Sequence, residues 1–286
     1  MATDAANAAG AAGPGGRAVT GQPPVAVITG AGRGIGAATA LLLARLGWQV
    51  LAIDLAADDP SLPYPLASRA QLDRLAADAA AETGRPSIEV AVADVRDAGL
   101  LSELVRGAQQ RWGRLDAAIA AAGVIAGGVP SWQLPADQQR TVLEVNLVGV
   151  INLANAAIPV LLEQPAPRSG RFIAVASAAA SRGLPMLAAY CAAKAGVAGF
   201  VRALAVELGE SGITANAVSP GSTATGILDE SARLYGLSSA TEFAQQQPMH
   251  RLLEPAEVAA LLGFLAGPDS SGLTGAVIPV DGGLAL

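Results

Sequence analysis

Short apolar runs alternate with longer amphipathic or Ala-rich segments along most of the chain. Runs such as 25–29 and 171–176 are apolar on both faces, which favours strands buried inside a parallel sheet. Longer periodic segments such as 35–46 favour helices. The predicted strands are 25–29, 49–54, 88–93, 115–120, 171–176, 213–218 and 276–279, and the predicted helices are 35–46, 69–83, 98–112, 137–162, 187–209 and 255–266. This alternation predicts an α/β fold, with a doubly wound parallel sheet of about seven strands and helices on both faces.

The alternation runs unbroken from residue 23 to 286, which predicts a single domain. Residues 1–22 are rich in Ala and Gly and have no apolar periodicity, so we expect a flexible extension there. They lack the basic region and apolar core of a secretory signal. Two segments of the domain stand outside the alternation: an insertion near 56–70, and a stretch of small and polar residues near 226–251. We expect the second to lie over the mouth of a ligand site as a substrate lid.

A glycine-rich turn follows the first predicted strand in the sequence VAVITGAGRGIG. Gly30, Gly34 and Gly36 allow a tight turn and close backbone approach to a phosphate, and the next helix offers free N–H groups at its N-terminus. The second strand ends in Asp54, whose carboxylate would accept hydrogen bonds from the ribose 2′-OH of NAD and repel the 2′-phosphate of NADP. Arg33 leaves NADP as an alternative cofactor, because a cation in this loop would help to hold that phosphate. The pattern predicts a Rossmann-type dinucleotide-binding domain that takes NAD.

Tyr190 and Lys194 lie four residues apart in LAAYCAAKAGVAGF, a segment predicted to be helical. An i, i+4 pair lies on one helix face, so the phenol and the ammonium can enter one pocket. A nearby cation favours phenolate, and we expect Lys194 to lower the pKa of Tyr190 below its usual value of about 10, as a general acid/base requires. Ser177 ends the apolar run RFIAVAS and can offer its hydroxyl to the same pocket.

These motifs together resemble the short-chain dehydrogenase/reductase family, and the resemblance runs from about Pro24 to the C-terminus. It implies catalytic roles for Ser177, Tyr190 and Lys194, with Asn146 of EVNLVG as a fourth catalytic residue that holds a water-mediated proton path to the lysine. The cofactor-binding residues expected from the motifs and the resemblance are Gly30, Arg33, Gly34, Ile35, Gly36, Asp54, Asp94, Val95, Gly123, Tyr190, Lys194, Pro220, Gly221, Thr223 and Thr225.

Two of these contacts are assigned by the resemblance alone: Asp94 to the adenine ring and Thr225 of PGSTAT to the nicotinamide amide. One departure is clear, because the family's N-N-A-G after the fourth strand reads A-A-A-G here, ending at Gly123. The chain therefore lacks an asparagine side chain that braces the sheet in the family.

The insertion carries the sequence LAADDPSLPYPLASRAQ, with three prolines around Tyr64. Proline-rich segments are stiff and nonhelical, so we expect an ordered loop near the adenosine end of the cofactor. The insertion resembles that of the mycofactocin-coupled subfamily of these dehydrogenases. In that subfamily it covers the nicotinamide cofactor so that it does not exchange freely, and mycofactocin reoxidises it in place. A surface loop without such a role is the alternative interpretation.

Composition narrows the choice of partners and compartment. Hydrophobic residues make up 52% of the chain and charged residues 15%, which favours a large core and large subunit interfaces. The net charge is −6 and no basic cluster is present, so nucleic acid is not an expected partner. No segment is a convincing membrane span, and no metal site is expected. The single cysteine, Cys191, suits a reducing cytoplasm. The long apolar helices predicted at 137–162 and 187–209 pair across subunit interfaces in the family, which implies a homotetramer.

The chain is thus expected to be an NAD-dependent oxidoreductase that interconverts a small hydrophobic alcohol and its carbonyl by hydride transfer, with tightly bound NAD reoxidised by mycofactocin. Two alternatives are an ordinary short-chain dehydrogenase or ketoreductase with exchangeable NAD(P), and a nucleotide-binding regulator without chemistry. The complete Ser–Tyr–Lys–Asn set argues against the regulator. In the lid, Tyr235, Leu237, Phe243 and Met249 either line an apolar substrate pocket or pack the lid onto the body.

Overall fold

Seven parallel strands form one sheet in the computed structural model, which describes residues 21–286. They are β1 (Val25–Thr29), β2 (Gln49–Asp54), β3 (Ile88–Val92), β4 (Ala117–Ala120), β5 (Arg171–Val175), β6 (Thr214–Pro220) and β7 (Val277–Val280). Their order across the sheet is β3-β2-β1-β4-β5-β6-β7, so the direction of travel reverses between β1 and β4. Ligands of open α/β sheets bind outside the carboxyl ends of the strands at such a reversal. The predicted Rossmann-type sheet is confirmed, while residues 1–20 of the expected extension lie outside the described residues.

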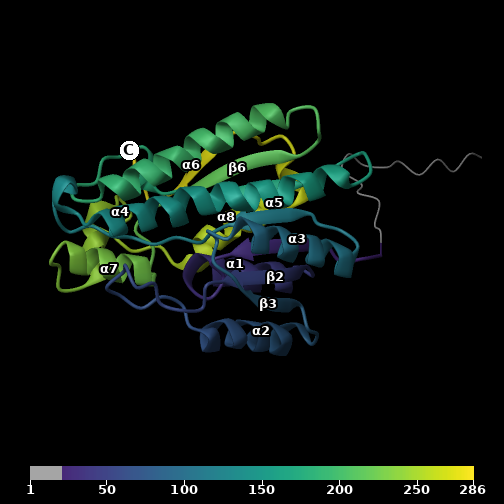
Figure 1. Cartoon of the computed structure of the whole chain (residues 1–286), viewed down its shortest axis with the longest axis horizontal. Coiled ribbons are helices and arrows are strands. Elements are labelled where there is room, and N and C mark those ends of the chain that lie inside the picture. The colour runs from purple at the N-terminus through teal and green to yellow at the C-terminus, as the bar shows by residue number, and fades with distance from the viewer. Residues whose placement is uncertain (1–20) are drawn as a thin grey trace, which may run out of the picture.

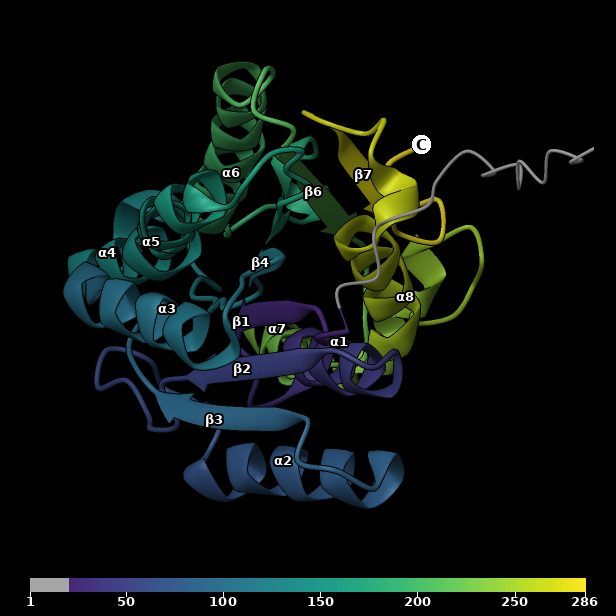
Figure 2. The same ribbon diagram turned by 90° about the vertical axis from the view of Figure 1, so that its right-hand side faces the viewer.

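Helices cover both faces of this sheet (Figure 1 and Figure 2). They are α1 (Gly34–Arg45), α2 (Arg69–Thr83), α3 (Ala98–Trp112), α4 (Ala136–Leu143), α5 (Gly149–Glu163), α6 (Ala188–Glu207), α7 (Gly226–Leu234) and α8 (Pro255–Ala266). Helices α1, α2 and α8 pack on one face around one hydrophobic core. Helices α3, α5 and α6 pack on the other face around a second core. The two cores explain why the central strands are apolar along their whole length.

Local sequence signals set several helix ends. Helix α2 begins after Ser68, whose hydroxyl accepts a hydrogen bond from the Gln71 backbone N–H while the Gln71 side chain accepts from the Ser68 N–H. This reciprocal arrangement is a capping box. The helix ends at Gly84, which adopts a left-handed φ of 70° that an L side chain rarely takes. The predicted range 69–83 is therefore confirmed at both ends.

The helix predicted as one α-helix over 137–162 is wrong in its middle. Helix α4 ends at Leu143, a π-helical turn spans Glu144–Val148, and α5 follows from Gly149. Asn146 lies inside this turn, and its side-chain amide donates 2.8 Å hydrogen bonds to the carbonyls of Val142 and Val124. The carbonyl four residues back is the one that the α-helical ladder would use, so the side chain competes with the regular backbone bond.

Two described helical stretches, Ala136–Glu163 and Ala188–Glu207, are long and apolar enough to cross a membrane by length and composition alone. In the first of them, 61% of the most apolar window is buried inside the fold, where it packs against the sheet and α3. A core helix meets the same criterion, so these stretches give only weak support for a membrane span. The expectation that the protein has no membrane partner stays a prediction.

Phe172 offers a test of the core beneath α6. Its side chain is fully buried on β5 and makes an edge-to-face contact with Phe200 of α6, with ring centroids 6.5 Å apart. We predict that Phe172→Ala lowers the free energy of unfolding by about 3–5 kcal/mol, because a buried aromatic side chain leaves a cavity. Urea unfolding followed by circular dichroism would measure it. The control Leu46→Ala removes a side chain that is 60% exposed and should change stability by less than about 0.5 kcal/mol. Equal effects of the two variants would contradict the prediction.

Candidate active site

The loops after β1 and β4 meet as bare backbone at the carboxyl edge of the sheet. Gly30 has a positive φ of 68°, and a Cβ atom there would lie 2.5 Å from the Cα of Ala122. A Cβ on Gly36 would lie 2.1 Å from the carbonyl oxygen of Gly30. Neither distance is possible for a real side chain, so both positions require glycine. The turn leads directly into α1, whose first N–H groups face the space beyond the sheet edge.

Asp54 and Arg33 hold different parts of this edge. The Asp54 carboxylate accepts hydrogen bonds from the backbone N–H groups of Gly32 at 2.8 Å and Ala56 at 3.1 Å, which fixes it at the end of β2. The Arg33 guanidinium extends toward α7, where it lies 3.1 Å from the position of a Cβ on Gly226. Arg33 therefore bridges the glycine-rich loop and the first residue of α7.

A cavity of 610 Å³ opens along the carboxyl ends of the strands. All fifteen expected cofactor-binding residues line it, and so does Ser177. The agreement concerns location, and the roles of these residues stay predictions. Among the expected catalytic and cofactor-binding residues, Asn146 alone does not line the cavity, because it is fully buried behind the wall.

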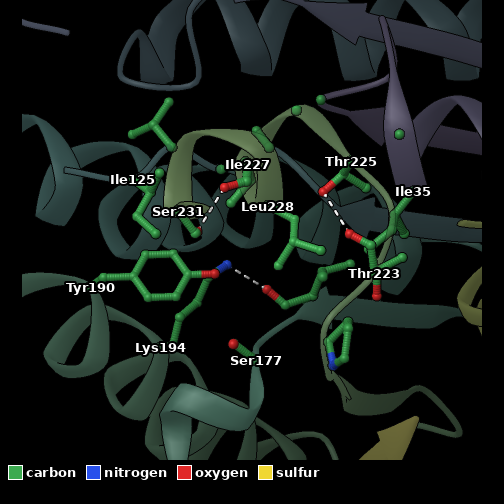
Figure 3. A pocket seen from close by; sticks show the side chains of 18 of the residues that line it. Ile35, Ile125, Ser177, Tyr190, Lys194, Thr223, Thr225, Ile227, Leu228 and Ser231 are labelled. Atoms are coloured by element: carbon green, nitrogen blue, oxygen red, sulfur yellow. Dashed lines mark hydrogen bonds between the residues drawn. The ribbon is translucent and has the colours of Figure 1, made fainter. Parts of the chain in front are cut away.

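Tyr190, Lys194 and Ser177 point toward one end of the cavity (Figure 3). Tyr190 and Lys194 lie one turn apart on α6, and both are buried, with 8% and 3% of their surfaces exposed. The Lys194 ammonium donates a 2.8 Å hydrogen bond to the carbonyl of Val175 at the end of β5. Ser177 follows two residues later, and its backbone carbonyl accepts a 2.5 Å hydrogen bond from the Ser219 hydroxyl. The ends of β5 and β6 thus hold the serine, and the end of β5 also holds the lysine.

Burial dominates the ionisation of this pair, and the expected lowering of the Tyr190 pKa is wrong. Burial raises the pKa of Tyr190 above its ordinary value; its hydrogen bond with Ser177 opposes that rise. Burial also lowers the pKa of Lys194 to about 8. The spacing alone suggested that the cation would stabilise phenolate. The structure adds that both groups lose their hydration and that the ammonium bonds to a carbonyl.

Asn146 holds the cavity wall from behind. Its side-chain oxygen accepts a 3.2 Å hydrogen bond from the Val124 N–H, and its amide nitrogen donates to the Val124 carbonyl. Gly123 lies beside it, and a Cβ there would be 3.0 Å from the Asn146 oxygen and 3.8 Å from the Lys194 ammonium. The segment after β4 therefore passes close to both the asparagine and the lysine.

The insertion packs over the end of the cavity next to β2 and β3. Asp59 is buried and pairs with Arg96 at 2.8 Å, and Arg96 also binds Asp94 at 2.5 Å. Ser61 bonds the Thr141 hydroxyl of α4 at 2.8 Å. Leu55, Asp59, Leu66 and Ala67 all line the cavity. Sequence reasoning missed Arg96 as the link between the insertion and Asp94, although its place in ADVRD, next to a predicted site residue, was a usable signal.

The lid closes the other end of the cavity. It contains helix α7 and a 3₁₀ turn, Ala240–Gln246. Lid residues that line the cavity are Ile227, Leu228, Ser231, Tyr235, Leu237, Phe243 and Gln246. Tyr235 and Phe243 also contact each other edge to face, and the Tyr235 hydroxyl donates a 2.7 Å hydrogen bond to the Pro185 carbonyl. These two aromatic side chains therefore both line the cavity and pack the lid onto the body. Met249 does not line the cavity and is 53% exposed, so the pocket-lining alternative is wrong for this residue.

Comparisons with known proteins agree with this architecture. The family model described as enoyl-(acyl carrier protein) reductase matches residues 30–285. The chain is 34% identical to (−)-trans-carveol dehydrogenase of Rhodococcus erythropolis, over 92% of this chain and 97% of the relative. Among solved structures, carveol dehydrogenase from Mycobacterium avium in complex with NAD superposes with a TM-score of 0.85 at 31% identity, and levodione reductase with 0.83 at 31%. Each structural match covers 92% of this chain and 98% of the other. The chain belongs to the short-chain dehydrogenase/reductase family, as an oxidoreductase that acts on alcohol and carbonyl groups.

Proposed function

We propose that the chain is an NAD-dependent oxidoreductase that interconverts a hydrophobic alcohol and its carbonyl, and that it holds NAD tightly for reoxidation by mycofactocin. The proposal rests on the way in which the expected catalytic and cofactor-binding residues are arranged along one cavity. Buried Tyr190 and Lys194 lie with Ser177 at one end, and Asp54 lies with the glycine-rich loop at the other.

The residues present fit NAD. The glycine-rich turn leaves space and N–H groups for a pyrophosphate at the N-terminus of α1. Asp54 is oriented by two backbone N–H groups and lines the cavity, where its negative charge suits a ribose 2′-OH and opposes a 2′-phosphate. Arg33 reaches toward α7, which supports a role over the pyrophosphate or the lid in preference to a 2′-phosphate.

The end of the cavity where Tyr190, Lys194 and Ser177 lie, here called the reacting end, supplies the groups for the reaction. NAD, when bound, supplies the hydride acceptor for alcohol oxidation. Tyr190 as phenolate removes the hydroxyl proton, and Ser177 donates a hydrogen bond to the substrate oxygen as it becomes a carbonyl. Lys194 holds the nicotinamide ribose, and Asn146, which is fixed to the Val124 backbone, helps to hold a water-mediated proton path to Lys194.

Tight retention is supported by the packing of the insertion. Asp59 is 5% exposed and pairs with Arg96, which also holds Asp94, an expected adenine contact. Leu66 and Ala67 line the cavity beside it. A dinucleotide seated there would leave only after this ordered segment moved, and slow exchange requires such an arrangement. Coupling to mycofactocin rests on the resemblance of the insertion to that subfamily.

The lid supports an apolar substrate, because Ile227, Leu228, Leu237 and Phe243 line the cavity near Tyr190. Two relatives bear the name carveol dehydrogenase, which makes a cyclic terpenoid alcohol a reasonable first substrate to test. We also propose a cytoplasmic homotetramer assembled through the long apolar helices, without nucleic-acid or membrane partners.

Gly30→Ala tests the nucleotide loop. The added Cβ would meet the Ala122 backbone at 2.5 Å and force a left-handed φ on alanine, so the loop must shift. We expect NAD affinity to fall at least about tenfold, measured by calorimetry on protein stripped of nucleotide. The control Gly107→Ala lies in α3 with open space around the new Cβ and should leave affinity unchanged. Unaltered affinity in Gly30→Ala would place the dinucleotide elsewhere.

Tyr190→Phe tests the proposed base. We expect kcat to fall by about 10²–10⁴ while the bound NAD content stays that of the unaltered protein. In the unaltered protein, alcohol oxidation should rise with pH because it needs the phenolate, whose formation burial opposes by raising the pKa. Carbonyl reduction should fall with pH because it needs the protonated phenol. Near-normal turnover by Tyr190→Phe would show that another group is the base.

Purification without added nucleotide tests retention. Denaturation should release about one NAD or NADH per chain, identified by liquid chromatography and mass spectrometry. Asp59→Ala removes the buried partner of Arg96 and should lower that content, while Asp73→Ala removes only a surface ion pair of α2 and should not. An empty protein that turns over alcohols with added NAD would identify an ordinary dehydrogenase with exchangeable cofactor. An empty protein that binds NAD but never turns over would support the regulator.

A further inference from the structure

Tyr64 connects the insertion to the wall of the reacting end. Its side chain is 9% exposed, and its hydroxyl accepts a 2.9 Å hydrogen bond from the backbone N–H of Ile125, 61 residues away. Ile125 is itself only 2% exposed and lines the cavity. A buried N–H without a partner is costly, and the tyrosine hydroxyl supplies that partner.

The backbone next to Ile125 is hydrogen-bonded to Asn146, one of the proposed catalytic residues. Asn146 bonds both the N–H and the carbonyl of Val124. A Cβ atom on Gly123, one residue earlier, would lie 3.0 Å from the Asn146 oxygen and 3.8 Å from the Lys194 ammonium. Val124 and Ile125 are therefore both held by side-chain hydrogen bonds close to these groups, and Tyr64 holds Ile125.

The Tyr64 phenol keeps its proton, so its hydrogen bond with Ile125 does not depend on pH near neutrality. Burial raises its pKa to about 12; the hydrogen bond from Ile125 and the charge of Arg33 oppose that rise, and Glu230 and Tyr190 add to it. The phenol therefore stays protonated throughout the pH range in which the enzyme would be assayed. These neighbours come from the glycine-rich loop, α7 and α6, so the phenol lies where these elements meet the insertion.

We propose that Tyr64 is a positioning residue of the active site. Through Ile125 and Val124 it sets the place of Asn146 and of the cavity wall beside Tyr190. The insertion would then serve the reacting end as well as the adenosine end. This inference rests on the proposed catalytic function, because it assumes that the Asn146 side of the pocket takes part in proton transfer.

Tyr64→Phe tests the proposal, since it removes one oxygen and keeps the ring. The matched control is Ser61→Ala, which removes the insertion's hydroxyl bonds to Asp59 and to Thr141 of α4 but leaves the bond from Ile125 to Tyr64 in place, so that it reports any general loosening of the insertion. Both variants are loaded with NAD and mixed with trans-carveol in single-turnover experiments. In Tyr64→Phe we expect the rate of hydride transfer to fall about tenfold with less than a threefold change in KM, because positioning and not uniform binding is lost. We expect Ser61→Ala to stay within twofold on both measures.

Hydrogen exchange of the peptide that contains Val124 and Ile125 provides an independent readout. Its amides should exchange at least about tenfold faster in Tyr64→Phe and unchanged in Ser61→Ala. The proposal is overturned if Tyr64→Phe retains a rate within twofold of normal, if Ser61→Ala is equally slow, or if Tyr64→Phe only loses NAD while the loaded fraction reacts normally. Failure of the proposed function would appear separately, as turnover that survives Tyr190→Phe.

Discussion

The contact between Gly30 and Ala122 is the constraint on which the site depends. Strands β1 and β4 are neighbours at the point where the strand order reverses, and their loops can meet only if no side chain lies between them. The bare backbone of Gly30 satisfies that condition and also passes beneath Gly36 at the start of α1. The nucleotide loop and the segment that carries Gly123 therefore pack directly against each other. A shift of either loop would move the dinucleotide end and the reacting end together.

At the reacting end, burial favours the neutral form of two side chains: it raises the pKa of Tyr190 and lowers that of Lys194. Tyr190 resists losing its proton, and Lys194 gives up its proton more readily than an exposed lysine. The carbonyl of Val175 accepts a hydrogen bond from the Lys194 ammonium and keeps it oriented. Desolvation of both side chains, which the i, i+4 spacing does not reveal, therefore governs the charge state of the pocket.

Most of the fold and of the cavity lining could be predicted because the relevant signals are local. Strand and helix periodicity, the capping box at Ser68, the glycine-rich turn and the spacing of Tyr190 and Lys194 each lie within a few residues. The bond from Ile125 to Tyr64 and the pairing of Asp59 with Arg96 could not be predicted, since they arise from the way in which an irregular insertion packs. The pKa of Tyr190 was misjudged for a related reason: the spacing of two residues on a helix contains no information about how deeply both are buried.

The π-helical turn at Glu144–Val148 has a consequence for how this protein tolerates change in length. An α-helix turns about 100° per residue, and a π turn accommodates one more residue without rotating the helix beyond it. Removal of one residue other than Asn146 from this turn would therefore restore regular α-helical geometry and leave the face that α5 presents to the sheet unchanged. Removal of one residue from the regular part of α4 or α5 would instead rotate the helix beyond it by about 100° and turn apolar side chains away from the sheet. The turn at Glu144–Val148 is thus the position in this long helix where the loss of one residue disturbs the packing of α5 least.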